Sequence, residues 1–368
     1  MMTNRLLPFK DMGGCSISGI MDESGRLFSG DEVIRSIANM HDRSNGLGGG
    51  FAAYGIYPDR ADQYAMHLMF DTPAAKSATE ALLNERAIVH RAEEIPTRPH
   101  PNISDEPLVH RYFVNIEPDR SRPHLDEDDL MVELHMEINT TVQDAFVFSA
   151  GKNMGCFKGV GYPEDLGEYF RLDEYEAYIW IAHGRFPTNT TGWWGGAHPF
   201  SILDWAIVHN GEISSYGINK RYLRNFGYEC TLQTDTEVIA YFFDLLIRKH
   251  GLPLEVACQA MAPPFWEDIA RMDGEEQAQA RAIRAVYGGA LLNGPFAVVV
   301  GSTGRMIGFS DRTKLRPQVC ARGGDRLYIA SEEAAIRTIC PDPDVVWHPD
   351  GGEPVVGELQ AGVEVAAG

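Results

Sequence analysis

The stretch 178–237 constrains this chain more than any other, because three predicted element ends there carry many polar side chains. The apolar runs 178–182 and 205–208 predict two strands, and the apolar spacing of 238–250 predicts a helix. Packing alone does not require polar groups at the ends of all three elements. We therefore expect these ends to converge on one small polar ligand.

The polar groups at these ends form a suitable receptor for the amide of an α-amino acid. Arg185 follows the first strand and can clamp an α-carboxylate through two hydrogen bonds. Asp235 precedes the helix and can accept from an α-ammonium group. The Asn210 side-chain amide and the Gly211 backbone N–H, after the second strand, can together stabilise an oxyanion, because glycine permits close approach of the backbone.

Purely structural explanations exist for the same residues. Thr234 and Glu237 match a helix capping box, in which Asp235 would only favour the start of the helix. Asn210-Gly211 is also a common dipeptide of hairpin turns. The combination of all these residues in this order favours the binding site.

Cys15 is the candidate nucleophile, because it follows Gly13-Gly14 at the start of a run that alternates like a strand. We expect residues 1–14 to be a leader whose removal makes Cys15 the N-terminal residue. Its α-amino group, with an ordinary pKa of about 7.7–8.0, would then lie beside the thiol and accept its proton. The structural alternative is one more buried thiol behind a tail.

Composition and motif spacing argue against several other classes of protein. The chain has 32 Lys and Arg against 52 Asp and Glu, a net charge of −20, which disfavours nucleic acid and anionic membranes as partners. It has no apolar run of membrane-spanning length and no secretory signal, and its six cysteines form no C-x-x-C motif, so we expect a cytoplasmic protein with reduced thiols.

The sequence also predicts no metal site and no cofactor. His183, His198 and His209 do not have the spacing of ligands on one helix face, and no His-Glu-x-x-His motif is present. A G-x-S-x-G nucleophile motif is likewise absent. The chain shows no nucleotide-binding pattern and has no room for a flavin-binding barrel.

Residues 15–368 are predicted to form one domain. Region 61–177 is predicted to be an insertion within it, because the candidate site has partners on both sides. The other expected elements are strands at 131–138 and 144–150, a polar amphipathic helix at 74–94, helices over 254–286 with a break near Pro263-Pro264, and an antiparallel meander of strands at 294–301, 305–310 and 326–331.

Several motifs give the chain a family resemblance: CSISGIM at Cys15, IAHGRFPTNT, AHPF, IVHNGEISSYG, TDTEVIA, GPFAVVVG, SDRTKLRP and ASEEAAI. At these motifs the chain resembles the class II glutamine amidotransferases, which use an N-terminal nucleophile. The resemblance is closest to the amidotransferase part of glutamate synthases. One departure is Ser16, which follows Cys15 where the family usually has glycine.

The resemblance implies an α+β fold, a four-layer αββα sandwich of two antiparallel sheets. It also implies these roles: Cys15 as nucleophile, Asn210 and Gly211 as oxyanion hole, Arg185 and Asp235 as recognition pair for glutamine, and Phe186 and Thr188 as lining of the glutamine pocket.

We therefore expect the processed chain to hydrolyse glutamine through a Cys15 thioester. The ammonia would pass to a synthase or flavin-containing partner subunit of a glutamate synthase, or of a related N-methylglutamate synthase.

A different hypothesis is an unprocessed, catalytically inactive binding or regulatory homologue whose leader occupies the pocket. A third, a hydrolase of another amide, is disfavoured by Arg185 and Asp235.

Overall fold

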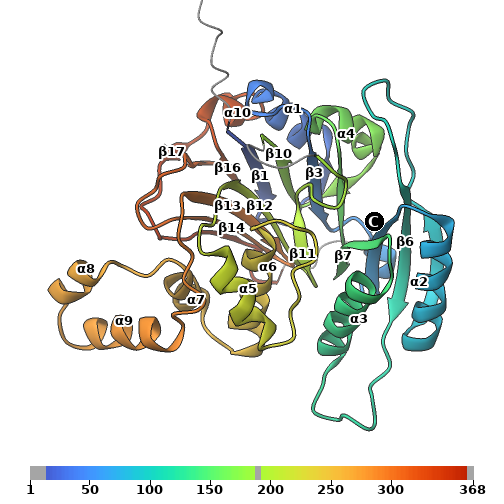
Figure 1. Cartoon of the computed structure of the whole chain (residues 1–368). Coiled ribbons are helices and arrows are strands. Elements are labelled where there is room, and N and C mark those ends of the chain that lie inside the picture. The colour runs from blue at the N-terminus through green and yellow to red at the C-terminus, as the bar shows by residue number, and fades with distance from the viewer. Residues whose placement is uncertain (1–13, 187–191, 363–368) are drawn as a thin grey trace, which may run out of the picture.

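Two antiparallel β-sheets lie face to face at the centre of the molecule (Figure 1). The structure is a computed structural model and describes residues 14–186 and 192–362. The larger sheet has seven strands, in the spatial order β17 (Val345–Trp347), β15 (Val319–Gly323), β16 (Arg326–Ala330), β1 (Ser16–Asp22), β10 (Ile179–Gly184), β3 (Gly49–Tyr54) and β8 (Met154–Gly159). The smaller has five, in the order β11 (Phe200–Ile202), β12 (Trp205–Gly211), β13 (Phe296–Ser302), β14 (Arg305–Ser310) and β18 (Val355–Glu358).

Successive side chains of β12 point to opposite faces of the sheet, so this strand contributes to two hydrophobic cores. Ala206 and Val208 join the core between the two sheets, whereas Ile207 points into the core on the other face of the five-stranded sheet. The sheets approach closely at Gly19 of β1, where an added Cβ would lie 2.7 Å from Val299 Cγ1. A mixed α and β fold with several antiparallel sheets is therefore confirmed.

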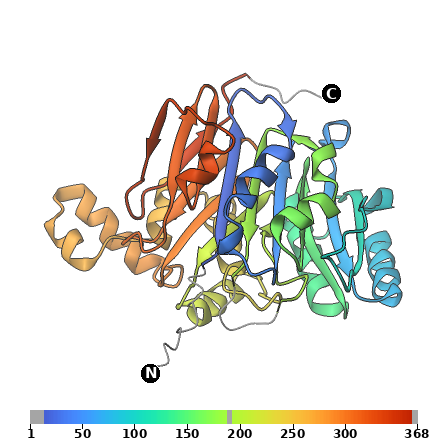
Figure 2. The same ribbon diagram turned by 90° about the horizontal axis from the view of Figure 1, so that it is seen from above.

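Helices cover the outer faces of both sheets (Figures 1 and 2). The seven-stranded sheet is covered by α1 (Asp31–Ala38), α4 (Pro163–Tyr169) and α10 (Glu333–Arg337). On the other side, α6 (Glu237–Phe243) contacts β11 and β12, α5 (Tyr216–Arg224) packs on α6, and the π-helix η4 (Asp244–Lys249) continues α6. Three further helices, which lie at the left of Figure 1, are α7 (Leu254–Met261), α8 (Trp266–Arg271) and α9 (Gly274–Val286).

A third sheet lies beside the two central sheets (Figure 1). Its strands are β5 (Ile88–Glu94), β6 (Leu108–Asn115), β4 (Tyr64–Phe70) and β7 (Ala145–Lys152), with helices α2 (Pro73–Arg86) and α3 (Glu127–Thr141). The remaining short elements are the strand pair β2 (Phe28–Ser29) and β9 (Glu176–Ala177), and the 3₁₀ turns η1 (His41–Arg43), η2 (Pro58–Arg60) and η3 (Leu172–Glu174).

The third sheet falls inside region 61–177. The region is not one structural unit, however, because β8 belongs to the seven-stranded sheet and α4 covers that sheet. The description of 61–177 as a family-variable insertion stays a prediction.

Three expected elements differ from the structure. Residues 131–138 lie in the helix α3, not in a strand, and the expected helix 74–94 ends at Arg86 and is followed by strand β5. The expected three-stranded meander is wrong as well, since β13 and β14 pair in the five-stranded sheet while β16 pairs with β1 and β15 in the other. The expected break near Pro263-Pro264 is confirmed between α7 and α8.

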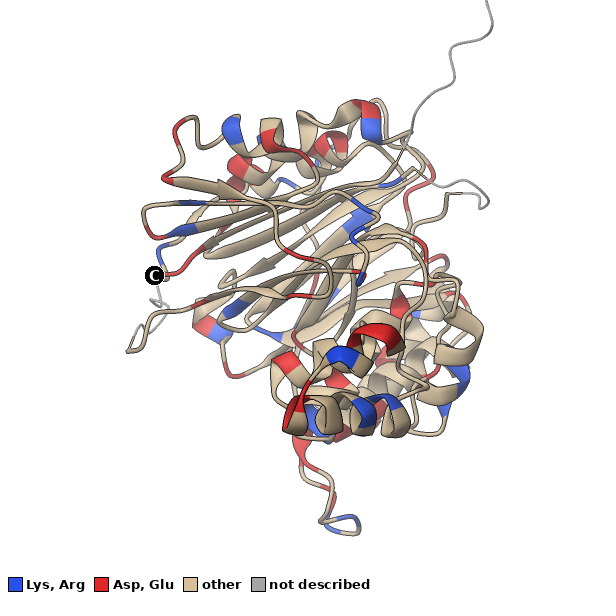
Figure 3. Cartoon of the chain, turned by 90° about the vertical axis from the view of Figure 1, so that its left-hand side faces the viewer, with Lys and Arg blue, Asp and Glu red and all other residues tan. Residues whose placement is uncertain are grey.

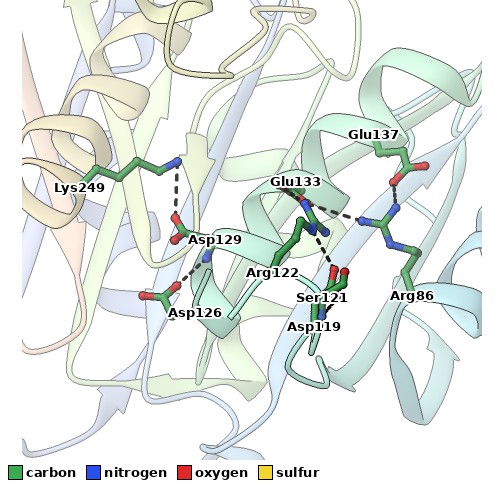
Figure 4. Close-up of polar contacts among 9 residues, drawn as sticks. All are labelled: Arg86, Asp119, Ser121, Arg122, Asp126, Asp129, Glu133, Glu137 and Lys249. Carbon is green, nitrogen blue, oxygen red and sulfur yellow. Dashed lines mark hydrogen bonds and ion pairs between the residues drawn. The ribbon is translucent and has the colours of Figure 1, made fainter. Parts of the chain in front are cut away.

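Ion pairs attach helix α3 to its surroundings (Figure 4). Arg122 Nη1 lies 2.8 Å from each carboxylate oxygen of Glu133 on α3, and Lys249 Nζ of η4 lies 3.5 Å from Asp129 Oδ1. Ion pairs near the protein surface typically contribute about 0–1 kcal/mol each, so the buried apolar residues of α3 stabilise its position more. Figure 3 shows acidic and basic residues interspersed over helices and loops, with the sheets mostly uncharged.

Candidate active site

Strand pairing brings Cys15 next to Arg185. Strands β1 and β10 are antiparallel neighbours, and Ser16 lies opposite Gly184, so the residue before β1 meets the residue after β10. Gly211 ends β12 in the facing sheet. The ends of β10 and β12 and the segment before α6, which the sequence singled out, line one pocket.

A pocket of about 440 Å³ opens between these ends. Six predicted site residues line it: Cys15, Arg185, Phe186, Asn210, Gly211 and Asp235. The seventh, Thr188, lies outside the described residues. The volume lies in the range of small-ligand sites in proteins. What the pocket can bind depends on the chemistry of the groups that line it.

Hydrogen bonds hold the backbone and the thiol of Cys15. Arg43 donates to the Cys15 carbonyl oxygen from Nε and Nη2, at 3.4 and 3.3 Å, and pairs with Glu332 through Nη1 at 2.9 Å. The backbone N–H of Phe186 donates to Cys15 Sγ at 3.4 Å. Cys15, the residue before β1, is thus held at the pocket by Arg43 at its carbonyl oxygen and by the Phe186 N–H at its sulfur.

The pKa of the Cys15 thiol is raised above its ordinary value. Burial is the main cause, and the Phe186 N–H and the positive charges of Arg185 and Arg316 oppose it. A thiol of this kind is protonated at neutral pH. Because the thiolate is the nucleophilic form, chemistry at this sulfur requires a base that takes the proton.

Asn210 presents a hydrogen-bond donor to the pocket. The residue is 1% exposed, and its side-chain Nδ2 is buried without a hydrogen-bond partner among the described residues. Buried polar groups normally have partners, and an unpaired one typically costs about 1–3 kcal/mol. The orphaned donor is therefore suited to an oxygen of a bound ligand.

Gly211 is required by the backbone at this point. Its φ is +145°, and an added Cβ would lie 2.0 Å from the Pro295 carbonyl oxygen. The residue still pairs with Phe296 of β13, so Asn210-Gly211 is the end of a central strand. The hairpin-turn explanation for this dipeptide is wrong.

The carboxylates of Asp235 and Glu237 do not form a capping box at the start of helix α6. Its Oδ2 accepts a hydrogen bond from the backbone N–H of Ile213, with 2.6 Å between the heavy atoms. The Glu237 carboxylate reaches back to the N–H groups of Thr231 and Leu232, at 3.0 Å each, and not to that of Thr234. The capping-box explanation is therefore wrong as well.

Arg185 and Asp235 place opposite charges in the same pocket. Burial lowers the pKa of the Arg185 guanidinium, although the nearby charges of Cys15 and Asp235 favour its charged form. Arginine remains protonated despite such a shift, because its ordinary pKa exceeds 12. A pocket lined by both a cation and an anion suits a ligand that carries both charges.

Sequence reasoning missed two features of the pocket. Arg316, from the loop after β14, lines it, and its Nε is buried without a hydrogen-bond partner among the described residues. His198 and His209 line it too, and the ring of His198 stacks on that of His183. No local pattern in the sequence signals either feature, because sheet packing brings the residues together.

The described residues contain no group of three or more His, Cys, Asp or Glu side chains that could hold a metal ion. The six cysteines are all free thiols. Among the helices in the described part of the chain, none combines the length and apolarity needed to cross a membrane.

Comparison with known proteins defines the class. Residues 49–346 match the family model of the class II glutamine amidotransferases, so the chain belongs to that family. It is 53% identical over 359 residues to an uncharacterized protein of Archaeoglobus fulgidus, a match that covers 97% of this chain and 95% of the relative.

More distant matches carry names. The chain is 26% identical over 214 residues to the glutamine amidotransferase-like protein GlxB of Rhizobium meliloti, covering 56% of this chain and 60% of that protein. Among solved structures, glutamine phosphoribosylpyrophosphate amidotransferase from B. subtilis aligns with a TM-score of 0.43 at 14% identity, over 94% of this chain and 47% of that one.

Proposed function

We propose that the processed chain hydrolyses the side-chain amide of glutamine to glutamate and ammonia. Membership of the class II glutamine amidotransferases supports this proposal. The observation that carries it is the convergence of a cysteine, an oxyanion-type donor pair and two opposite charges on one pocket. In this proposal Arg185 binds the α-carboxylate of glutamine and Asp235 binds its α-ammonium group, while Phe186 and Thr188 line the pocket.

The proposed reaction has two steps. The Cys15 thiolate attacks the carboxamide carbon, and the oxyanion that forms accepts hydrogen bonds from Asn210 Nδ2 and the Gly211 N–H. The C–N bond then breaks, and the proton that came from the thiol leaves with ammonia. Water attacks the resulting γ-glutamyl thioester, releases glutamate and restores the thiol.

The base in this proposal is the α-amino group of Cys15. While Gly14 is attached, the Cys15 nitrogen is an amide, which does not accept a proton near neutral pH. Removal of residues 1–14 converts it into an amine with an ordinary pKa of about 7.7–8.0. The active domain is accordingly residues 15–368, and its two central sheets with their helices form the αββα sandwich of N-terminal nucleophile hydrolases.

We further infer that the ammonia passes to a synthase partner in the cytoplasm. The motif IAHGRFPTNT, which contains Arg185 and Phe186, supports an assembly of the glutamate synthase type. Ammonia is a nucleophile only when it is unprotonated, so transfer inside a complex with a flavin-containing subunit suits the product. An N-methylglutamate synthase is the alternative assembly. Co-purification, with flavin absorbance as the readout, tests for the partner subunit. Activity with 2-oxoglutarate would then identify a glutamate synthase, and activity with methylamine an N-methylglutamate synthase.

A direct test combines intact mass with glutaminase activity. We expect purified protein to begin at Cys15 and to release glutamate and ammonia in equal amounts from glutamine. Cys15→Ala should remove the activity, whereas Cys340→Ala, another partly exposed free thiol, should retain it. A chain that keeps its Met1 terminus and shows no hydrolysis would instead identify an unprocessed, inactive homologue.

A further inference from the structure

Three histidines and one threonine form a buried polar cluster at the wall of the pocket, which His198, His209 and Thr236 line. We call it the histidine–threonine cluster; it consists of His183 of β10, His198 before β11, His209 of β12 and Thr236 before α6. The rings of His183 and His198 stack with centroids 3.8 Å apart, and His209 lies 6.3 Å from His198. Four separate segments of the chain therefore meet at this point.

The Thr236 hydroxyl connects two of the histidines. Its Oγ1 lies 2.9 Å from His198 Nε2 and 3.0 Å from His209 Nδ1. His183 Nε2 donates to the carbonyl oxygen of His209 at 3.0 Å. His209 is thus held twice, through its ring by Thr236 and through its carbonyl by His183.

The cluster is electrically neutral near pH 7, because burial lowers the pKa of all three histidines, that of His183 to about 3. A neutral imidazole carries one N–H, and a hydroxyl carries one proton. The Thr236 hydroxyl has one proton, which it can give to one histidine or to Asp235 Oδ1 at 3.5 Å, and its oxygen can accept from a histidine N–H. Removal of the hydroxyl leaves two buried ring nitrogens without partners, which is costly.

Chain neighbours link the cluster to the proposed chemistry. The His209 carbonyl that accepts from His183 belongs to the peptide bond that leads into Asn210. Thr236 directly follows Asp235 and its hydroxyl lies 3.5 Å from Asp235 Oδ1, but the N–H of Ile213 holds Asp235 Oδ2 more closely, at 2.6 Å. Loss of the Thr236 hydroxyl should therefore release the end of β12 more than it releases Asp235.

From this geometry we infer that Thr236 is a positioning residue: its hydroxyl fixes His209, and through it the oxyanion donors of Asn210 and Gly211, in the pocket. The inference rests on the proposed glutaminase function. It assigns Thr236 an effect on the turnover rate, since oxyanion donors act on the transition state. It assigns no direct contact between Thr236 and glutamine.

The test is steady-state glutaminase kinetics of Thr236→Val, which replaces the hydroxyl by a methyl group of similar size. We expect kcat to fall at least about tenfold, while KM for glutamine changes less than about threefold. Thr236→Ser restores the hydroxyl and should return kcat to within about threefold of the wild type. Thr236→Ala, which adds no methyl group beside the imidazoles, should reproduce the loss if the valine variant does not fold.

Thr79→Val is the matched control. Thr79 is fully buried, and its hydroxyl donates to Ala75 O at 3.0 Å within α2, in the third sheet layer. We expect this variant to keep the wild-type kcat even if its melting temperature falls.

Three outcomes would overturn the inference. An unchanged kcat in a folded Thr236→Val or Thr236→Ala variant excludes positioning through the hydroxyl. A failure of Thr236→Ser to restore kcat, or an equal loss in Thr79→Val, indicates a general packing effect. If the wild-type protein has no glutaminase activity, the proposed function itself is wrong. The first two outcomes, by contrast, require an active wild type and contradict only the role of Thr236.

Discussion

The carboxylate of Asp235 accepts a hydrogen bond from the backbone N–H of Ile213, with 2.6 Å between Oδ2 and N. This bond ties the loop before α6 to the segment that follows β12, two residues after Gly211. It also directs Asp235 into the pocket and leaves its other oxygen 3.4 Å from Thr234 Oγ1 and 3.5 Å from Thr236 Oγ1. The bond from Ile213 requires only an oxygen that accepts, and not a charge. A substitution that keeps this oxygen therefore tests the charge of Asp235 alone.

Asp235→Asn removes the charge and keeps an oxygen that can accept from Ile213. We expect KM for glutamine to rise about tenfold to 100-fold, because a hydrogen bond to a charged group contributes about 1.5–3 kcal/mol. The melting temperature should stay close to that of the wild type. Kinetics and thermal denaturation on the same preparation check both expectations, and a KM within threefold of wild type contradicts the recognition role.

Asn210→Ala tests the proposed oxyanion donor. We expect kcat to fall about 10²- to 10³-fold with little change in KM, as for loss of one such donor in other enzymes. Folding should be nearly unaffected, because Asn210 Nδ2 has no hydrogen-bond partner among the described residues.

Asn219→Ala is the matched comparison for this prediction. Asn219 is also buried, but its Nδ2 donates to the carbonyl oxygens of Gly289 and Leu291, at 2.8 and 3.0 Å. Its loss should lower the free energy of unfolding by about 1–3 kcal/mol and leave kcat largely intact. If the two asparagine variants showed the same pattern, Asn210 would have a structural role.

The parts of the site that could be predicted from sequence are those with a local signal. The strands β10 and β12 are continuous apolar runs that end in polar residues, and a glycine after Asn210 indicates close backbone approach. The histidine–threonine cluster has no such signal. Its members become neighbours only when two sheets pack and a helix start is placed behind them.

Helix α3 shows a different limit. Its residues Met131–Ile138 include β-branched and long apolar side chains that suggested a strand, and buried positions occur on most of its faces. A helix that is buried on most of its faces loses much of the apolar periodicity by which a helix is recognised. The Asp126 side chain, which accepts from the N–H of Asp129, marks its start, and Leu130 and Leu134 lie one turn apart in the core.

Gly211→Ala tests the backbone at the end of β12. Two costs are expected together, since φ is +145° and the new Cβ would lie 2.0 Å from Pro295 O. Gly227→Ala separates them, because Gly227 has a φ of +89° but no atom within 4 Å of an added Cβ. We expect Gly227→Ala to cost about 1 kcal/mol of unfolding free energy and Gly211→Ala clearly more, with loss of activity. Equal losses in denaturant titrations would contradict the steric argument.

Glu237 should make stability depend on pH. Its carboxyl is fully buried and accepts from the N–H groups of Thr231 and Leu232 and from the Tyr241 hydroxyl. Burial raises its pKa from 4.5 to about 7, although these N–H groups and the charge of Lys158 act in the opposite direction. Between these two pH values the folded chain keeps a proton that the unfolded chain releases. The contribution of Glu237 to stability is therefore complete below pH 4.5 and lost as pH rises through 7.

The size of this change follows from the shift, since each pKa unit corresponds to about 1.4 kcal/mol and the total is about 3 kcal/mol. We expect Glu237→Gln to flatten the decline in unfolding free energy between pH 5 and pH 8, measured by denaturant titration. Glu267→Gln, on a side chain of α8 that is 87% exposed, should leave the wild-type slope unchanged. If Glu237→Gln kept the full wild-type slope, the buried carboxyl would not be its source, because glutamine has no proton to release in this range.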